Sequence, residues 1–308
     1  MKVYQSIEEF SEAKNSVVTI GTFDGVHVGH QQIISKLKEA AQQENGETVV
    51  LTFFPHPRMV LQPDDNDLKL ITTMPERIEL LREYGIDHLI IQPFSKEFSR
   101  ISAVEFVRDI LVNKIGMKTL VIGHDHHFGR NREGSYKDLE EMAPVYNFRL
   151  VEIPEQVVNE VAVSSTKIRN ALLSGDIKTA NRLMGHEFTL NGKVIDGEKV
   201  GRQLGFPTAN ISVAESYKLI PATGIYAVLV KVEDVIYQGM LYIGNRPVFQ
   251  GKQLSIEVNI FDFDQSIYNH HISVMLKDRI RDDMQFKNSD ELKKKMEEDK
   301  LIAVKILS

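Results

Sequence analysis

Two histidines at helical spacing follow a glycine-rich segment near the start of the chain. The segment reads Gly-Thr-Phe-Asp-Gly-Val-His-Val-Gly-His over residues 21–30. Its glycines allow a ligand to approach the backbone closely. His27 and His30 are three residues apart, so on a helix they share one face and can both donate hydrogen bonds to phosphoryl oxygens. A helix that begins here also turns its free N–H groups and positive dipole end toward such an anion.

Two other interpretations of this segment stay open. A glycine-rich turn between a strand and a helix can be purely structural, and two histidines three apart can bind a metal ion. We see no nearby Asp or Glu with an obvious metal-ligand spacing, which favours a phosphate site. The His-Asp-His-His run at 124–127 leaves a similar choice between a polar loop and a zinc site.

A second candidate site lies in the carboxy-terminal half, where residues 205–210 read Gly-Phe-Pro-Thr-Ala-Asn. Thr208 and Asn210 are two apart, so in an extended segment both oxygens point to one side. Hard oxygen ligands suit Mg²⁺ that arrives with a nucleotide. Glu257 lies between two β-branched apolar residues, and a lone inward carboxylate there needs a reason, such as a role as a base. An outward Glu257 on a half-exposed strand is the alternative.

The sequence around the first site predicts alternating strands and helices. Short apolar runs are expected as strands at 16–20, 48–54, 89–91 and 119–122. Apolar residues at helical spacing, with capping boxes that begin at Thr73 and Ser102, predict helices between them. The runs are continuously apolar, which is typical of strands buried on both faces. The predicted fold class of this half is α/β, a Rossmann-like doubly wound parallel sheet.

The pattern changes near residue 185. Strand-like runs separated by glycine and turn residues follow at 188–194, 225–231, 235–243, 255–261 and 271–276. They predict an antiparallel barrel or sandwich. A polar helix over about 290–299 closes the chain. We therefore expect one domain over residues 1–185 and a second over 186–308.

Composition excludes several classes of protein. The 308 residues include 37 Lys and Arg against 43 Asp and Glu, a net charge of −6, which argues against a nucleic-acid partner. No apolar run approaches the ~18 residues that span a bilayer, and the first residues lack the layout of a signal peptide. Cysteine is absent, so disulfides, thiolate nucleophiles and Cys-ligated zinc are excluded. We expect a cytoplasmic protein that acts on small molecules; its oligomeric state stays open.

The string at 21–30 resembles the signature of the nucleotidylyltransferase superfamily and, in its longer form, the FMN adenylyltransferase module of prokaryotic FAD synthetases. The run at 163–169 resembles that superfamily's Ser/Thr-rich turn before a helix. Pro55-His56-Pro57 and the run at 123–129 resemble the family's flavin- and nucleotide-facing loops. The resemblance implies a catalytic set of His27, His30 and Arg169, the last holding the pyrophosphate that leaves. It implies nucleotide binding by Gly21, Phe23, Asp24, Gly25, Gly29, Asp125, Ser164, Ser165 and Thr166, and flavin binding by Pro55, Pro57 and Phe128.

The Pro-Thr-Ala-Asn run at 207–210 resembles the signature of riboflavin kinase. The segments at 224–227, 244–247, 255–264 and 279–282 resemble further elements of that family. The resemblance implies that Glu257 is the general base and that Thr208 and Asn210 bind Mg²⁺ with the nucleotide. It also implies ATP or flavin binding by Gly201, Pro207, Tyr226, Asn245 and Arg279. Together the two resemblances cover nearly the whole chain, in the order of a bifunctional riboflavin kinase/FAD synthetase.

The implied function is the phosphorylation of riboflavin to FMN by ATP, followed by adenylylation of FMN to FAD with release of pyrophosphate, both with Mg²⁺. Four positions depart from the family pattern: Phe54, His126, Val200 and Val248. Two rivals stay open. The chain can retain a single activity, with adenylylation favoured, or it can be a flavin-binding regulator without turnover.

The two reactions make different chemical demands. The ribityl 5′-hydroxyl is a neutral alcohol and must lose a proton, so a base helps the kinase step. The FMN phosphate, with a second pKa of about 6, is already largely anionic at neutral pH. It needs positioning and charge neutralisation instead of a base. We therefore expect a catalytic carboxylate only in the carboxy-terminal half.

Overall fold

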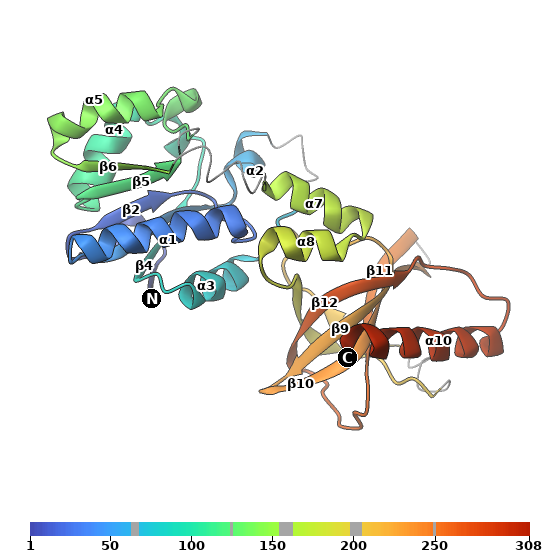
Figure 1. Cartoon of the computed structure of the whole chain (residues 1–308). Coiled ribbons are helices and arrows are strands. Elements are labelled where there is room, and N and C mark those ends of the chain that lie inside the picture. The colour runs from blue at the N-terminus through green and yellow to red at the C-terminus, as the bar shows by residue number, and fades with distance from the viewer. Residues whose placement is uncertain (63–67, 124–125, 154–162, 198–204, 249–250) are drawn as a thin grey trace. The chain divides into compact units, whose positions relative to one another are not determined.

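The computed structural model describes residues 1–62, 68–123, 126–153, 163–197, 205–248 and 251–308, and the side chains of 246–253 lie outside that description (Figure 1). Contacts within the chain divide it into two compact units, Met1–Ser165 and Thr166–Ser308.

The first unit is built on a parallel six-stranded sheet with the order β1-β4-β3-β2-β5-β6. Its strands are β1 (Lys2–Tyr4), β2 (Val17–Ile20), β3 (Thr48–Phe54), β4 (His88–Pro93), β5 (Thr119–Gly123) and β6 (Arg149–Ile153). From β2 the chain builds the sheet toward one edge through β3 and β4, and then toward the other through β5 and β6. The carboxyl end of β2 is therefore at the switch point of the sheet, where α/β proteins bind ligands.

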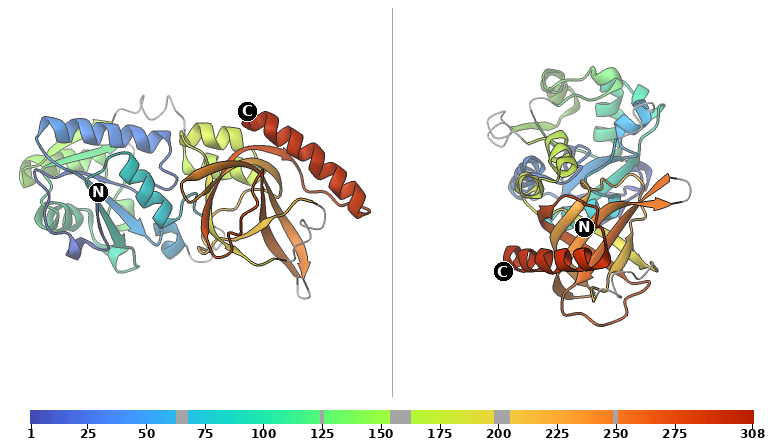
Figure 2. Two further views of the ribbon diagram at one scale, coloured as in Figure 1. Left: turned by 90° about the horizontal axis from the view of Figure 1, so that it is seen from below. Right: turned by 90° about the vertical axis from the view of Figure 1, so that its right-hand side faces the viewer.

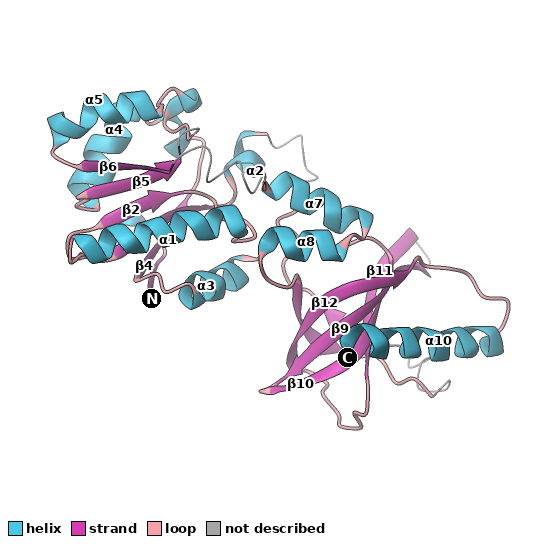
Figure 3. Ribbon diagram, viewed as in Figure 1, coloured by secondary structure: helices cyan, strands magenta, loops and turns pink. Residues whose placement is uncertain are grey.

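Helices cover both faces of this sheet (Figure 3). They are α1 (Val28–Gln43), α2 (Pro57–Leu61), α3 (Met74–Glu83), α4 (Ala103–Glu105), which continues as a π-helix over Phe106–Lys114, and α5 (Tyr136–Tyr146). Val18 of β2 packs on one face with Leu111 of the π-helix. Val17 packs on the other with Leu37 of α1 and Leu81 of α3. The predicted doubly wound α/β fold is confirmed, as are the capping boxes at Thr73 and Ser102.

The second unit is a closed antiparallel barrel with the order β10-β11-β8-β7-β12-β9. Its strands are β7 (Thr189–Ile195), β8 (Ala209–Ser212), β9 (Gly224–Val232), β10 (Val235–Val248), β11 (Gly251–Ile260) and β12 (His271–Arg281). The barrel closes because β9 pairs with both β10 and β12. Of the barrel and the sandwich that the sequence left open, the structure shows the barrel.

Helix α10 (Ser289–Leu307) packs on the outside of this barrel, where it is the red helix in Figure 2. It is longer than the predicted 290–299, because its last turns carry the apolar contacts. Ala303 is fully buried among Met240 and Phe261 of the barrel. Asp299, with 1% of its surface exposed, forms a 2.7 Å ion pair with Arg281 of β12.

Helices α7 (Ser165–Ser174) and α8 (Ile177–Met184) precede the barrel, and contacts group residues 166–184 with it. Asn181 donates from its side chain to the carbonyl of Leu276 at 2.8 Å. The backbone N–H of Ala222 donates to the carbonyl of Leu172 at 3.1 Å. The domain limits 1–185 and 186–308 stay a prediction, since the compact units divide twenty residues earlier, at Ser165.

The buried pair between Arg281 and Asp299 generates a stability prediction. Replacing Asp299 with Ala leaves a largely buried guanidinium without its carboxylate, and we expect a loss of about 3 kcal/mol in the free energy of unfolding. Urea denaturation followed by circular dichroism measures it. Glu298→Ala, which removes an exposed pair with Lys295 on the same helix, is the control and should cost less than about 1 kcal/mol. Equal losses in the two variants would contradict the assignment.

Candidate active sites

The segment that follows β2 at the sheet's switch point has an unusual backbone. Phe23, Gly25 and Val26 have positive φ angles of 49°, 84° and 37°. Only glycine adopts this region without strain, so the conformation at Phe23 and Val26 must be held by the surrounding structure. The segment ends at His27, the N-cap of α1, whose ring nitrogen Nδ1 accepts from the backbone N–H of His30 at 3.4 Å.

The two imidazoles predicted to bind phosphate lie against each other. The His27 and His30 rings stack with centroids 3.7 Å apart and planes 16° apart. His27 is buried and His30 is half-buried. Desolvation, followed by the charges of His27 and Arg77, lowers the pKa of His30 well below its usual value of 6.5. Its Nδ1 is buried without a hydrogen-bond partner among the described residues, so an imidazolium would carry an N–H there with no acceptor. Both observations disfavour the charged form of the His30 imidazole.

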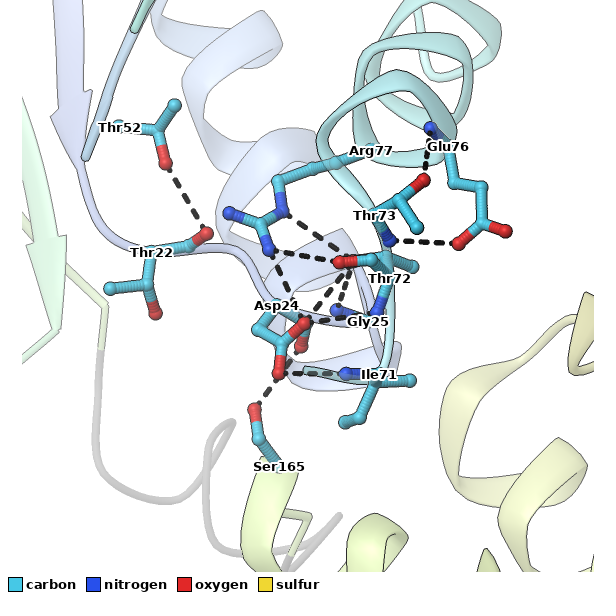
Figure 4. Close-up of polar contacts among 10 residues, drawn as sticks. All are labelled: Thr22, Asp24, Gly25, Thr52, Ile71, Thr72, Thr73, Glu76, Arg77 and Ser165. Carbon is cyan, nitrogen blue, oxygen red and sulfur yellow. Dashed lines mark hydrogen bonds and ion pairs between the residues drawn. The ribbon is translucent and has the colours of Figure 1, made fainter. Parts of the chain in front are cut away.

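Asp24 is fully buried, and its carboxylate is turned into the protein (Figure 4). It accepts hydrogen bonds from the backbone N–H groups of Ile71 and Thr72, both at 3.1 Å, and from the Thr72 hydroxyl at 3.2 Å. Arg77 of α3 pairs with it at 3.3 Å. Nucleotide binding by Asp24 stays a prediction, and the structure shows that its carboxylate holds the loop. Sequence reasoning missed Thr72 and Arg77, because about fifty residues separate them from Asp24.

The serine- and threonine-rich turn reaches the same loop. Ser165 donates from its hydroxyl to the backbone carbonyl of Asp24 at 3.1 Å, although 141 residues separate the two in sequence (Figure 4). Ser164 and Thr166 are exposed, and Arg169 is half-buried on α7, one helical turn beyond Ser165. Nucleotide contacts by these residues stay predictions.

The predicted flavin residues lie in two segments of the first unit, one after β3 and one between β5 and the 3-10 helix Arg130–Arg132. Pro55 is exposed directly after β3, and Pro57 is half-buried at the start of α2. Phe128 is 7% exposed and contacts Phe106 with ring centroids 6.1 Å apart. Flavin binding by these three residues stays a prediction. Phe54 and His126 are half-buried, and Asp125 lies outside the described residues.

On the barrel, Glu257 of β11 and Asn210 of β8 are cross-strand partners. The hydroxyl of Ser255 donates to Glu257 Oε1 at 2.8 Å, and that of Thr208 donates to Oε2 at 3.2 Å. Glu257 is only 8% exposed. The predicted base and one predicted metal ligand are thus in direct contact, and the role of Glu257 as a base stays a prediction.

Glu257 nevertheless differs from the expected inward carboxylate. It alternates along β11 with Val258, which lines a pocket of about 350 Å³, so Glu257 lies on the opposite face of the strand. The segment at Pro207 and Thr208 covers that face, since Asn259 donates from its side chain to the Pro207 carbonyl at 2.7 Å. This cover explains how an outward carboxylate is buried.

The pocket that Thr208 shares with this carboxylate has both apolar and polar lining residues. Its lining consists of Val194, Pro207, Thr208, Ala209, Val258, Ile260 and the loop residues Phe263, Asp264, Gln265, Ser266, Ile267 and Tyr268. Thr208 both lines the pocket and donates to Glu257, so it joins the cavity to the carboxylate. Sequence reasoning missed the loop at 265–268, which lacks a recognisable motif.

Two of the remaining kinase residues, Tyr226 and Arg279, lie close together in the barrel wall. The Arg279 guanidinium lies 6.0 Å from the ring centroid of Tyr226, donates to the Thr223 carbonyl and pairs with Asp282 at 2.7 Å. Tyr226 is fully buried, and burial raises its pKa to about 12. Ligand binding by Tyr226, Arg279 and the exposed Asn245 stays a prediction. Gly201 and Val200 lie outside the described residues, as does the side chain of Val248.

Two searches of the described part of the chain returned nothing. No group of three or more His, Asp or Glu side chains there is arranged to hold a metal ion. No described helix is both long and apolar enough to cross a membrane.

Comparison with known proteins matches each unit to a family. A family model for FAD synthetase matches residues 9–167, and one for riboflavin kinase matches residues 184–307. The bifunctional riboflavin kinase/FMN adenylyltransferase of Buchnera aphidicola from Acyrthosiphon pisum is 36% identical, over 99% of this chain and 98% of its own length. Those of Escherichia coli K12 and Bacillus subtilis 168 are 33% and 36% identical, over 98% and 96% of this chain and 97% and 94% of their own lengths.

This chain belongs to the bifunctional riboflavin kinase/FMN adenylyltransferase family. A crystal structure described as a macrolide-efflux protein from Streptococcus pneumoniae shares the fold over 98% of both chains, with a TM-score of 0.88 and 32% identity. The family assignment confirms the resemblance and the order of the two modules. Arg169 lies in the short stretch, residues 168–183, that neither family model covers.

The surroundings of His30 generate a pH prediction for this family member. In the ligand-free protein His30 should titrate well below 6.5, because burial and two nearby basic groups disfavour its charged form. A bound triphosphate should raise that pKa, since its negative charge favours the imidazolium, so nucleotide binding should take up protons as the pH falls toward 6.5. NMR titration of labelled histidines with and without a non-hydrolysable ATP analogue measures both. A His30 pKa at or above 6.5 in the free protein would refute the prediction.

Proposed function

We propose that the chain makes FMN and FAD by two reactions on its two units. The barrel unit transfers the γ-phosphoryl group of ATP to riboflavin, and the α/β unit transfers the adenylyl group of a second ATP to FMN. The proposal rests on the observation that each unit carries a different kind of polar group at its candidate site. A buried carboxylate with two hydroxyl donors lies on the barrel, whereas stacked imidazoles lie at the switch point of the sheet.

Glu257 has the surroundings of a general base for the kinase step. The attacking 5′-hydroxyl of riboflavin must lose its proton as the new P–O bond forms, and a carboxylate within hydrogen-bond reach can accept it. Hydrogen bonds from Thr208 and Ser255 fix the orientation of both carboxylate oxygens. The limited exposure of Glu257 keeps bulk water away from the reacting groups.

Mg²⁺ is expected to enter this site with the nucleotide. The hydroxyl of Thr208 and the side-chain amide oxygen of Asn210 flank Glu257 and are the hard oxygen donors that Mg²⁺ prefers. When bound, the ion neutralises charge on the transferred phosphoryl group. The adjoining pocket offers apolar walls and the aromatic side chains of Phe263 and Tyr268 to the adenine ring.

Adenylyl transfer requires no base. An oxygen of the FMN phosphate attacks the α-phosphorus of ATP, a new P–O bond forms, and the bond to the β-phosphate breaks to release pyrophosphate. His27 and His30 supply N–H donors to the phosphoryl oxygens, where negative charge builds up. Arg169 is proposed to hold the departing pyrophosphate through paired N–H groups.

We also propose that the protein acts in the cytoplasm on small molecules, with no nucleic-acid partner. The net charge of −6 supports the last point, because binding to nucleic acid depends on many cationic contacts.

The kinase proposal predicts a selective loss in Glu257→Ala. Formation of FMN from riboflavin should fall about 10²- to 10⁴-fold, the usual contribution of a general base. Formation of FAD from supplied FMN should stay at the wild-type rate, since that step uses other groups. Incubation with ATP, Mg²⁺ and either flavin, followed by chromatography, measures both. Asp234→Ala, which removes a fully exposed carboxylate of the same barrel, is the control.

His30→Ala should show the reverse pattern. We expect FAD formation from FMN to fall about 100-fold through the loss of a transition-state donor, with FMN formation unchanged. If a folded variant at either position lost both activities, the two-site proposal would be wrong. Wild-type protein that binds flavin but consumes no ATP would instead support the regulator, and one that forms only a single product would support the single-activity rival.

A further inference from the structure

The loop that carries the histidines is held by contacts outside the sequence motif. Residues 23–26 include two non-glycine positions with left-handed backbone, each of which costs on the order of 1–3 kcal/mol. Gly25 adds a third positive φ and has little room, since a Cβ there would lie 3.1 Å from the Ile71 side chain. Such a conformation persists only where the surroundings determine it.

The Thr72 side chain forms hydrogen bonds with Asp24, Gly25 and Arg77 and so connects the contacts that hold the loop (Figure 4). Its hydroxyl donates to Asp24 Oδ1 at 3.2 Å and accepts from the backbone N–H of Gly25 at 3.0 Å. The Nε of Arg77 also donates to it, at 3.4 Å. One hydroxyl thus uses its donor and both acceptor sites, and fixes a side chain and a backbone group of the loop together.

Arg77 neutralises the charge in this network. Its guanidinium and the Asp24 carboxylate are both 1% exposed, and Nη2 lies 3.3 Å from Oδ1. The same Nη2 donates to the Thr72 carbonyl at 3.4 Å. Burying two charges is costly, and apolar residues of similar volume commonly stabilise a protein as well or better. The pair therefore needs a reason other than stability, and the loop beside it provides one.

The network is connected to the groups that face the nucleotide. The backbone carbonyl of Asp24 accepts from Ser165, and three residues further His27 caps α1. A change in the conformation of Asp24 or Gly25 therefore moves the imidazoles and the Ser165 hydroxyl relative to one another.

We propose that Arg77 and Thr72 are positioning residues for adenylyl transfer, which hold Asp24 and Gly25 so that His27, His30 and Ser165 meet the triphosphate in one geometry. The inference rests on the proposed adenylyltransferase activity. Neither residue is proposed to touch the substrate. The charge of Arg77 also contributes to the lowered pKa of His30.

Thr72→Val and Thr48→Val form a matched pair for the test. Thr48 is also a buried threonine of the first unit, and its hydroxyl donates to Asp87 and accepts the backbone N–H of Asp87, both at 2.8 Å. Thr48 is the first residue of β3, so it lies at the amino-terminal ends of the parallel strands, whereas the loop follows the carboxyl end of β2. Both substitutions remove one buried hydroxyl that donates to an aspartate and accepts a backbone N–H, although Thr72 also accepts from Arg77, and thermal unfolding measures how much each variant is destabilised.

We expect Thr72→Val to lower kcat for FAD formation from FMN about tenfold, because small misplacements of reacting groups carry large rate penalties. Its KM for ATP should change less than its kcat. Thr48→Val should retain the wild-type kcat, and riboflavin phosphorylation should be unchanged in both. Equal kcat values for the two variants, or a Thr72→Val effect confined to KM, would overturn the inference.

Arg77→Met and Arg77→Lys give a second, independent readout. The methionine variant keeps the length of the side chain but removes its charge, and we expect a loss of about 100-fold in kcat. Lysine restores the charge but offers one ammonium where Arg77 uses two nitrogens, so it should recover part of that loss. No recovery by lysine in a folded protein would contradict the positioning role.

These experiments distinguish a failure of the positioning role from a failure of the proposed adenylyltransferase activity. Wild-type protein that forms no FAD from FMN would remove the proposed activity and the inference with it. Wild-type activity with no difference between the Thr72 and Thr48 variants would remove the inference alone.

Discussion

The first site depends on one buried interaction, the pairing of the Asp24 carboxylate with Arg77 and with N–H groups from the segment before α3. A carboxylate without exposed surface must be compensated by nearby donors. Here the compensating donors come from residues 71–77, so the requirement to satisfy Asp24 ties the end of β2 to the start of α3. The strained backbone between Phe23 and Val26 and the stacked imidazoles beyond it are consequences of that tie.

The two units offer different polar groups to a phosphate substrate. In the α/β unit, the polar groups are stacked imidazoles, hydroxyls and a helix end at the switch point of a parallel sheet. In the barrel, a covered outer strand face holds a carboxylate between two hydroxyl donors, one of which also lines a pocket. The difference follows from the nucleophiles: an anionic phosphate needs donors, whereas an alcohol needs an acceptor for its proton.

Local sequence patterns predicted much of this fold, and long-range contacts account for most of what they missed. The four inner strands of the sheet and the capping boxes at Thr73 and Ser102 follow from short-range signals. The edge strands β1 and β6 were missed because they are partly exposed and lack a continuous apolar run. Barrel closure was left open, since it depends on β9 pairing with both neighbours. In the sites, motifs indicated Glu257 and Thr208, but no local signal could join Arg77 to Asp24.

The grouping of α7 and α8 with the barrel bears on how the two activities can be separated genetically. Leu172, Ile177, Ala180 and Met184 are fully buried, and the Asn181 side chain donates to Leu276 of β12 and accepts from the backbone N–H of Phe188. A gene fragment that starts where strand patterns begin, near residue 185, leaves these helices behind. The barrel would then expose the apolar surface that they cover, and such a fragment would be prone to aggregate. A kinase fragment that folds by itself must therefore include α7 and α8, although their sequence pattern resembles that of the α/β unit before them.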